Sequence, residues 1–130
     1  MPSIFTRILH KELPSFAIRE DDRFYAFLDI RPVMPGHTLV IPKVEVDEFF
    51  DLEAAALSGI LGFAQPIASA LKEVLGVSRV GLAVAGFDVP HAHLHLIPLN
   101  QMSDFDFTKA RPAAPEQLEA MAERIRGKLS

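Results

Sequence analysis

Three short stretches in the first third of the chain have the hydrophobic pattern of strands. Phe16 and Ile18 alternate with smaller or polar neighbours, a polar turn follows at 20–22, and residues 24–30 form a second apolar run rich in aromatics. Proline and glycine between 32 and 36 favour another turn, after which 37–41 (HTLVI) forms a third run that ends at Pro42. These patterns predict three antiparallel strands joined by turns.

Helical spacing of apolar residues follows over 52–75, with Gly76 suited to the position after the helix end. Pro66 is expected to kink this helix. Residues 54–71 lack charge, but polar residues interrupt them and acidic residues flank them, so a buried helix is favoured over a membrane span. Pro115 can open a last helix, about 115–129. Its apolar stripe consists of Leu118, Met121, Ile125 and Leu129.

Two more strands are predicted at 77–85 and 89–98, on either side of a turn at 86–88, whereas 100–115 has little periodicity. Local hairpins without repeated strand–helix–strand units favour an α+β fold. We expect a single domain over 1–130, with one antiparallel sheet of about five strands, a long helix and a C-terminal helix.

Composition excludes several classes of protein. The chain has 130 residues, a net charge of −4 and no cysteine, which removes thiol nucleophiles and thiolate metal sites. Without a Lys/Arg block, nucleic acid is not an expected partner. Charged residues enter the amino-terminal segment before a signal-peptide core develops, so we expect a cytoplasmic protein.

Three histidines, His91, His93 and His95, occupy alternate positions within five residues. On a strand they would share one face, about 7 Å apart, while Ala92 and Leu94 point to the core. A row of imidazoles suits an extended anionic ligand, and a neutral imidazole is a competent nucleophile, with the middle one the natural attacker. A metal-binding sheet protein is an alternative, but the third histidine is too far away and a nearby carboxylate ligand is missing.

The segment 91–97 (HAHLHLI) resembles the signature of the histidine triad (HIT) nucleotide hydrolases and transferases, in which histidines alternate with apolar residues. Residues 27–30 (FLDI) and 35–43 (PGHTLVIPK) look like the nucleoside-binding strand and turn of the same family. The resemblance runs from about residue 3 to 98 and implies a HIT-like fold.

The resemblance also implies roles for individual residues. His93 would attack the α-phosphorus of a nucleotide and carry a covalent nucleotidyl group, which water then removes. His91 and His95 would orient the phosphate or donate hydrogen bonds to it, Asp29 would bind the ribose, and His37 would contact phosphate or the leaving group. Lys43 is expected to be a surface charge. The apolar lining around the base would comprise Ile4, Phe5, Ile8, Phe27 and Ile30.

Two departures from the family pattern change this picture. Many bacterial relatives bind structural zinc through two cysteines and histidines, where this chain has Ser3, Thr6 and Glu45, so we expect no metal. The loop before the triad is short, and Asp88 stands where relatives have a serine or threonine that contacts phosphate or the leaving group. Asp88 is either a group that assists an amine leaving group or a turn aspartate.

The sequence therefore predicts a hydrolase of nucleoside 5′-phosphoramidate-type conjugates that works through a nucleotidyl-His93 intermediate, without a cofactor. Two alternatives remain open, a dinucleoside polyphosphate hydrolase and a nucleotide-binding regulatory module with little turnover. The expected partners are a purine nucleotide substrate and a second copy of the chain in a homodimer, with neither nucleic acid nor membrane.

Overall fold

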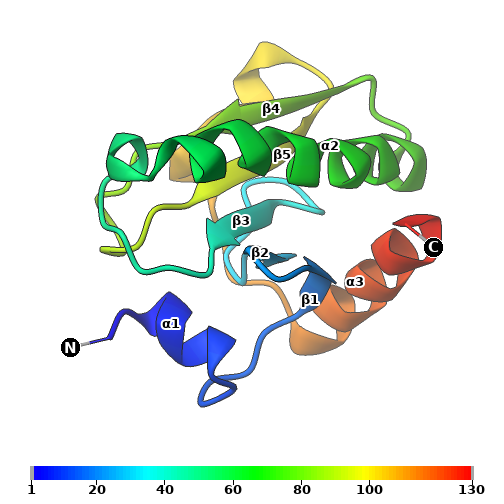
Figure 1. The fold of residues 1–130 in the computed structure, drawn as a ribbon. Helices are drawn as coiled ribbons and strands as arrows, with labels where there is room; N and C mark the ends of the chain where they lie inside the picture. The colour runs from blue at the N-terminus through cyan, green and yellow to red at the C-terminus, as the bar shows by residue number, and fades with distance from the viewer. Residues whose placement is uncertain (1, 130) are drawn as a thin grey trace.

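The computed structural model describes residues 2–129, and within them one antiparallel sheet has the strand order β1-β2-β3-β5-β4 (Figure 1). Its strands are β1 (Ala17–Glu20), β2 (Phe24–Leu28), β3 (Thr38–Pro42), β4 (Arg79–Ala83) and β5 (Leu94–Leu99). The helices are α1 (Ile4–Leu9), α2 (Ala54–Leu75) and α3 (Pro115–Leu129), with 3₁₀ turns η1 (Phe49–Asp51), η2 (Met102–Asp104) and η3 (Phe107–Lys109). The predicted α+β class, the five-stranded sheet and the C-terminal helix are confirmed.

Helices α2 and α3 pack on one face of the sheet, and the short helix α1 packs on the other. Alternation along β2 places Phe24 and Ala26 in the large core formed with α2 and α3, whereas Tyr25 and Phe27 face the other way and pack against α1. In Figure 1, α2 crosses in front of the sheet, α3 lies beside β1, and α1 stands apart near the N-terminus. The face opposite α2 is therefore only partly covered, and it is the face that carries the histidines.

Helix α2 matches the predicted helix except at its start, because the chain makes the turn η1 before Ala54. Gly76 ends the helix in the left-handed conformation, with φ 67°, as its position predicted. The helix continues through Pro66, which lies on the solvent side. By length and composition α2 could cross a membrane, but its Ile60 and Ile67 are buried against the sheet, as in a core helix.

The last strand is shorter than predicted. The pattern indicated a strand from residue 89 to 98, but β5 begins only at Leu94. Before it, the amide of His91 donates to the carbonyl of Val89 and that of Ala92 to Val46, while Pro90 has no amide hydrogen to offer a neighbouring strand. His91 and His93 therefore precede the strand, and among the triad only His95 lies within it.

Cross-strand pairing places His95 near the middle of the sheet. Ala17, Phe27, Leu39, His95 and Ala83 are successive partners from β1 to β4 in one row across all five strands. Residues in such a row point to the same face, here the face opposite α2. The sheet thus presents His95 beside the small aromatic cluster around Phe27.

Candidate active site

The triad histidines are packed into the protein rather than displayed on an open strand. His91, His93 and His95 are all buried, and the rings of His93 and His95 meet edge to face with their centroids 5.0 Å apart. The ring of Phe5, from α1, lies 5.1 Å from the ring of His93. The structure thus brings the three histidines together with Phe5, although the first two lie in a loop.

His93 is held so that one nitrogen stays available for chemistry. Its Nδ1 lies 2.8 Å from the carbonyl oxygen of His91, which can only accept a hydrogen bond, so Nδ1 carries the proton. When the ring is neutral, Nε2 therefore bears the lone pair. Nε2 has no hydrogen-bond partner among residues 2–129. This is the protonation pattern that a nucleophilic imidazole requires.

His95 is oriented by a relay that begins at a backbone amide. The amide of Val33 donates to Nδ1 of His37, 3.1 Å away, so His37 carries its proton on Nε2. That proton is donated to Nδ1 of His95 over 2.9 Å, which leaves the remaining proton of His95 on Nε2. His95 therefore presents a hydrogen-bond donor through the nitrogen that His37 does not use.

Burial makes both rings of this relay neutral at physiological pH. Desolvation lowers the pKa of His37 to about 4 and, with the neighbouring His37 and His93, lowers the pKa of His95 to about 3. His37 is only 1% exposed and both its nitrogens are engaged. A contact between His37 and a phosphate, predicted from sequence, would have to break the relay or act through His95.

His91 is engaged within the protein at both nitrogens. Its Nε2 donates to the carbonyl of Pro42 over 2.8 Å, and its Nδ1 lies 2.9 Å from the hydroxyl of Ser3, which donates to it. Burial lowers the pKa of His91, in keeping with a neutral ring. A phosphate contact by His91, as the family resemblance implies, would require one of these bonds to break.

A hydrogen-bond network links α1 to His91 at the positions where zinc ligands were considered. The Ser3 hydroxyl caps α1 by accepting from the Thr6 amide, and the Ser3 amide donates to Glu45 over 2.7 Å. The Thr6 hydroxyl donates to the same carboxylate over 2.5 Å and thereby lowers the pKa of Glu45. Oxygen donors that satisfy one another in this way favour a hydrogen-bonded junction over a zinc site, which is usually built from thiolate and imidazole ligands.

Asp29 lies at the edge of the histidine cluster. One carboxylate oxygen accepts from the amide of Arg31, the other is 3.7 Å from Nε2 of His37, and burial raises the pKa of the carboxyl group. Asp29, His37 and His95 each offer a ligand atom within 4.8 Å of the others. Because the Val33 amide forces the proton of His37 onto the nitrogen that would bind the metal, we interpret this group as a hydrogen-bond relay.

The residues predicted to line the base divide into two groups. Phe5 and Phe27 are buried and contact each other edge to face, with centroids 5.4 Å apart, and Ile8 packs against them, so these three belong to the core beneath the site. Ile4 and Ile30 are 48% and 60% exposed. Of the five predicted residues, these two have the largest exposed fraction and so the most free surface to offer a base.

Phe107 belongs to the site although the sequence pattern did not indicate it. Its ring lies 4.9 Å from that of His95 and 6.2 Å from that of His37. It comes from η3, in the tail segment that lacks periodicity, and a lone aromatic in such a segment carries no signal of its position. The tail therefore adds an apolar wall to the histidine cluster, although the family resemblance stops near residue 98.

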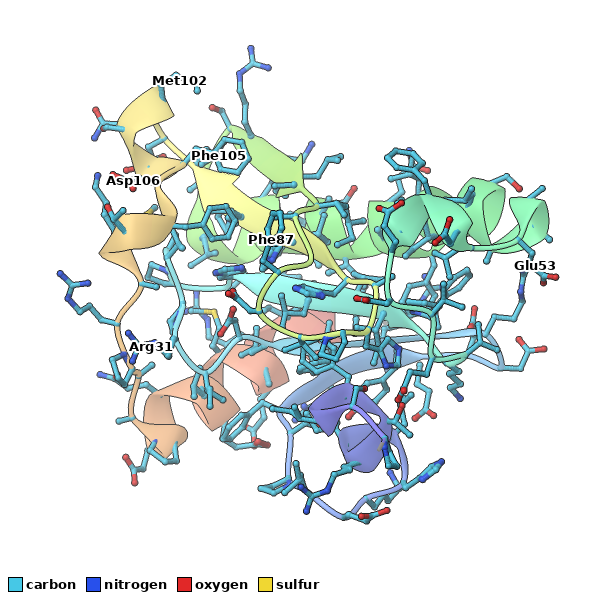
Figure 2. All side chains as sticks on the ribbon, turned by 90° about the vertical axis from the view of Figure 1, so that its left-hand side faces the viewer. Arg31, Glu53, Phe87, Met102, Phe105 and Asp106 are labelled. Atoms are coloured by element: carbon cyan, nitrogen blue, oxygen red, sulfur yellow. The ribbon has the colours of Figure 1, made fainter. Side chains whose placement is uncertain are left out.

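The loop 84–93, which carries His91 and His93, crosses the face of the sheet, with Phe87 near the centre of Figure 2. Phe87 is 96% exposed, and Gly86 beside it has φ 86°, a conformation that favours glycine. Asp88 is exposed, and its charge partly offsets the burial that lowers the pKa of His95. A cavity of about 350 Å³ opens between this loop and residues 47–49, with His93 in its wall.

Comparison with known proteins agrees with this geometry. The family profile described as the HIT domain matches residues 10–102. The chain belongs to the HIT family. A HIT-like protein from Bartonella henselae superposes with a TM-score of 0.86 at 31% identity, covering 97% of this chain and 95% of that one.

Two HIT-family relatives are yeast enzymes. The adenosine 5′-monophosphoramidase of Schizosaccharomyces pombe is 30% identical over 132 residues, which cover 99% of each chain. The adenosine 5′-monophosphoramidase of Saccharomyces cerevisiae is 38% identical over 96 residues, covering 73% of this chain and 61% of the relative. This HIT chain is thus a nucleotide-binding protein of a family that includes hydrolases.

Proposed function

We propose that this protein hydrolyses nucleoside 5′-phosphoramidates through a covalent intermediate on His93. The observation that carries the proposal is the hydrogen bond from Nδ1 of His93 to the His91 carbonyl, which leaves the Nε2 lone pair free on a residue that also lines a cavity. The relationship to two adenosine 5′-monophosphoramidases supports a purine nucleotide and an amine leaving group.

The reaction would proceed in two displacements. Nε2 of His93 attacks the α-phosphorus, a nitrogen–phosphorus bond to the enzyme forms, and the bond between phosphorus and the substrate amine breaks. The departing amine takes a proton from solvent. Water then attacks the same phosphorus and gives up a proton to solvent, the bond to Nε2 breaks with its electron pair returning to that nitrogen, and the nucleoside monophosphate leaves.

Neighbouring groups would stabilise the charge that grows on the phosphate oxygens. The Nε2 hydrogen of His95 is the donor available for this, because the relay from Val33 through His37 holds that ring in one orientation. His91 would act mainly by holding the loop that carries His93, since both its nitrogens are engaged. Asp29 would accept hydrogen bonds from the ribose hydroxyls, and Ile4 and Ile30 would contact the base.

Mass measurement of the intact protein tests the proposal. Wild type and His93→Ala are mixed briefly with an adenylated amine and quenched without acid, because a nucleotide linked to imidazole is labile in acid. An adduct of one nucleotidyl group, or turnover, in wild type alone is the expected result. If both proteins bind nucleotide and neither forms adduct or product, the proposal is wrong and a regulatory nucleotide-binding module takes its place.

Asp88 has a separate test. If its carboxyl group assists an amine leaving group, Asp88→Asn should change the pH–rate profile for an adenylated amine more than for a dinucleoside polyphosphate. Equal profiles for variant and wild type would leave Asp88 as a turn residue.

We also propose that the protein forms a homodimer through the sheet edge. Strand β4 is an outer strand, and beside it an apolar groove of about 380 Å³ lies between β4 and α2. Leu61 and Leu82, on its borders, are more than half exposed. Sedimentation should give a dimer for wild type and for Phe50→Glu, which alters another exposed aromatic, and a monomer for Leu82→Glu. A wild-type monomer would contradict this assembly.

A further inference from the structure

The cavity beside His93 lies apart from the residues expected to hold the nucleoside. Residues 47–49 form one wall, residues 84–87 form the other, and His93 joins them. Asp29 and the five apolar residues assigned to the base are absent from this lining. If the nucleoside is held at Asp29 and His93 attacks the phosphorus, this cavity is available to the other half of the conjugate, the leaving group.

His93, the proposed nucleophile, is also one of the residues that line the cavity. The side chain is only 3% exposed, its Nδ1 is bonded to a carbonyl, and its Nε2 has no partner within residues 2–129. No partnerless polar side-chain atom in that range is sealed from solvent, so Nε2 keeps some exposed surface. An in-line attack on phosphorus expels the group on the side opposite to the attacking nitrogen, so a leaving group held in this cavity would lie across the phosphorus from Nε2.

The charge around this cavity is negative. Asp47 and Glu48 lie in its wall, and Asp88 follows the wall residue Phe87 in the chain. All three are exposed, and within the described chain none of their carboxylates has a hydrogen-bond or ion-pair partner. No Lys or Arg of the described range lines the cavity. A cationic group of a ligand could therefore pair with these three carboxylates.

The remaining lining is apolar. Phe49 and Val84 are half-buried, and the ring of Phe87 stands almost fully exposed at the rim, in front of the sheet in Figure 2. Such a surface accepts an aliphatic stem, and an exposed aromatic face attracts an ammonium group. A phosphate leaving group would meet the negative charge of the carboxylates and no cationic side chain to donate hydrogen bonds to it.

We propose that this cavity binds the leaving group and selects amines that carry a second, cationic group on a short apolar stem over phosphate leaving groups. The inference rests on the proposed function, since it names the class of amine that the same site releases. It also decides between the two hydrolase activities that the sequence left open, because a polyphosphate would bring negative charge into a negative cavity.

The expected selectivity is modest because the carboxylates are exposed. Two carboxylates each about 6 Å from an ammonium group, in a dielectric close to that of water, favour the cation by roughly tenfold. Salt screens exposed charges over about 10 Å at 0.1 M, so the preference should shrink as ionic strength rises.

The experiment compares three substrates with the full chain. These are adenosine 5′-phosphoramidates of 1,5-diaminopentane and of pentylamine, which differ only in the terminal ammonium, and a dinucleoside tetraphosphate. We expect kcat/KM to be about tenfold higher for the diaminopentane conjugate than for the pentylamine conjugate at low salt, and lowest for the tetraphosphate. In an Asp47→Asn, Glu48→Gln double variant this ratio should fall towards one, whereas Glu53→Gln, an exposed carboxylate outside the cavity, should retain it.

Each outcome has a defined meaning. Turnover of both phosphoramidates with equal kcat/KM in wild type, or an unchanged ratio in the double variant, overturns the cation-selecting cavity while leaving the proposed hydrolase intact. A tetraphosphate that is cleaved faster than either phosphoramidate overturns it as well. Absence of adduct and turnover with all three substrates overturns the proposed function and this inference with it. Melting temperatures of the variants check that each remains folded.

Discussion

Replacing Ser3 with alanine removes two hydrogen bonds from the junction between α1 and the triad. The Ser3 hydroxyl accepts from the Thr6 amide at the start of α1 and donates to Nδ1 of His91, which is fully buried. Loss of a serine N-cap costs about 1 kcal/mol, and a buried acceptor left without a donor costs about 1–3 kcal/mol. We therefore expect Ser3→Ala to lower the free energy of unfolding by about 2–4 kcal/mol.

One compensation limits this figure. The Thr6 hydroxyl lies 3.4 Å from the same nitrogen of His91 and could turn towards it, but it would then give up its 2.5 Å bond to Glu45. The exchange replaces one lost bond by another, so the total should stay well above the loss of the cap alone.

Urea unfolding followed by circular dichroism measures the effect, with Ser58→Ala as the matched control. Ser58 is exposed and its hydroxyl bonds only to carbonyls of its own helix, Ala54 and Ala55, so its loss should change stability by less than about 0.5 kcal/mol. A loss for Ser3→Ala no larger than that of Ser58→Ala would refute the idea that this junction supports α1 and His91.

Three further predictions concern pH, glycine and metal. Because burial lowers the pKa of His37 to about 4 and of His95 to about 3, the unfolded chain binds protons below pH 6.5 that the folded chain does not. Protonation of the unfolded chain should therefore lower the free energy of unfolding as the pH falls below 6.5 and should continue to lower it down to about pH 3. A free energy of unfolding that stays constant over this pH range in urea titrations would contradict this. Gly36→Ala should destabilise the protein, since φ is 89° and the new Cβ would lie 2.6 Å from Leu75 Cδ1. Gly62→Ala, in the exposed part of α2, should instead raise the free energy of unfolding by about 1 kcal/mol and so raise the melting temperature. Equal melting temperatures for these two variants would count against the packing at Gly36. Dialysis against a chelator should leave turnover and melting temperature unchanged, and a loss restored by zinc would show that the protein holds a metal.

The elements of the fold follow closely from local patterns. Apolar runs at 24–30 and 37–41 predicted the strands that the structure has at 24–28 and 38–42, and the spacing of Leu118 and Ile125 predicted one buried stripe on the last helix. The position of Gly76 predicted the end of α2. These features depend on neighbours within a few residues, through backbone periodicity and the conformational freedom of glycine, so a single sequence contains them.

Strand ends depended on pairing partners. The apolar pattern continues smoothly from 89 to 98, yet β5 begins at Leu94, where its ladder with Val40 of β3 begins. The amide of Ala92 bonds to Val46 instead. The acceptor that this amide finds depends on the segment that packs beside it, and the local sequence does not specify that segment.

The candidate site shows the same division. The triad at 91–95 and its resemblance to the HIT family predicted His93 as the attacking residue. The proton positions that would suit His93 to nucleophilic attack and His95 to hydrogen-bond donation are set by the tertiary structure. The relay through His37 joins positions 58 residues apart, and the bond from Ser3 to His91 spans 88. A tautomer is set by the partner that each nitrogen meets, and only the folded chain brings those partners within 3 Å.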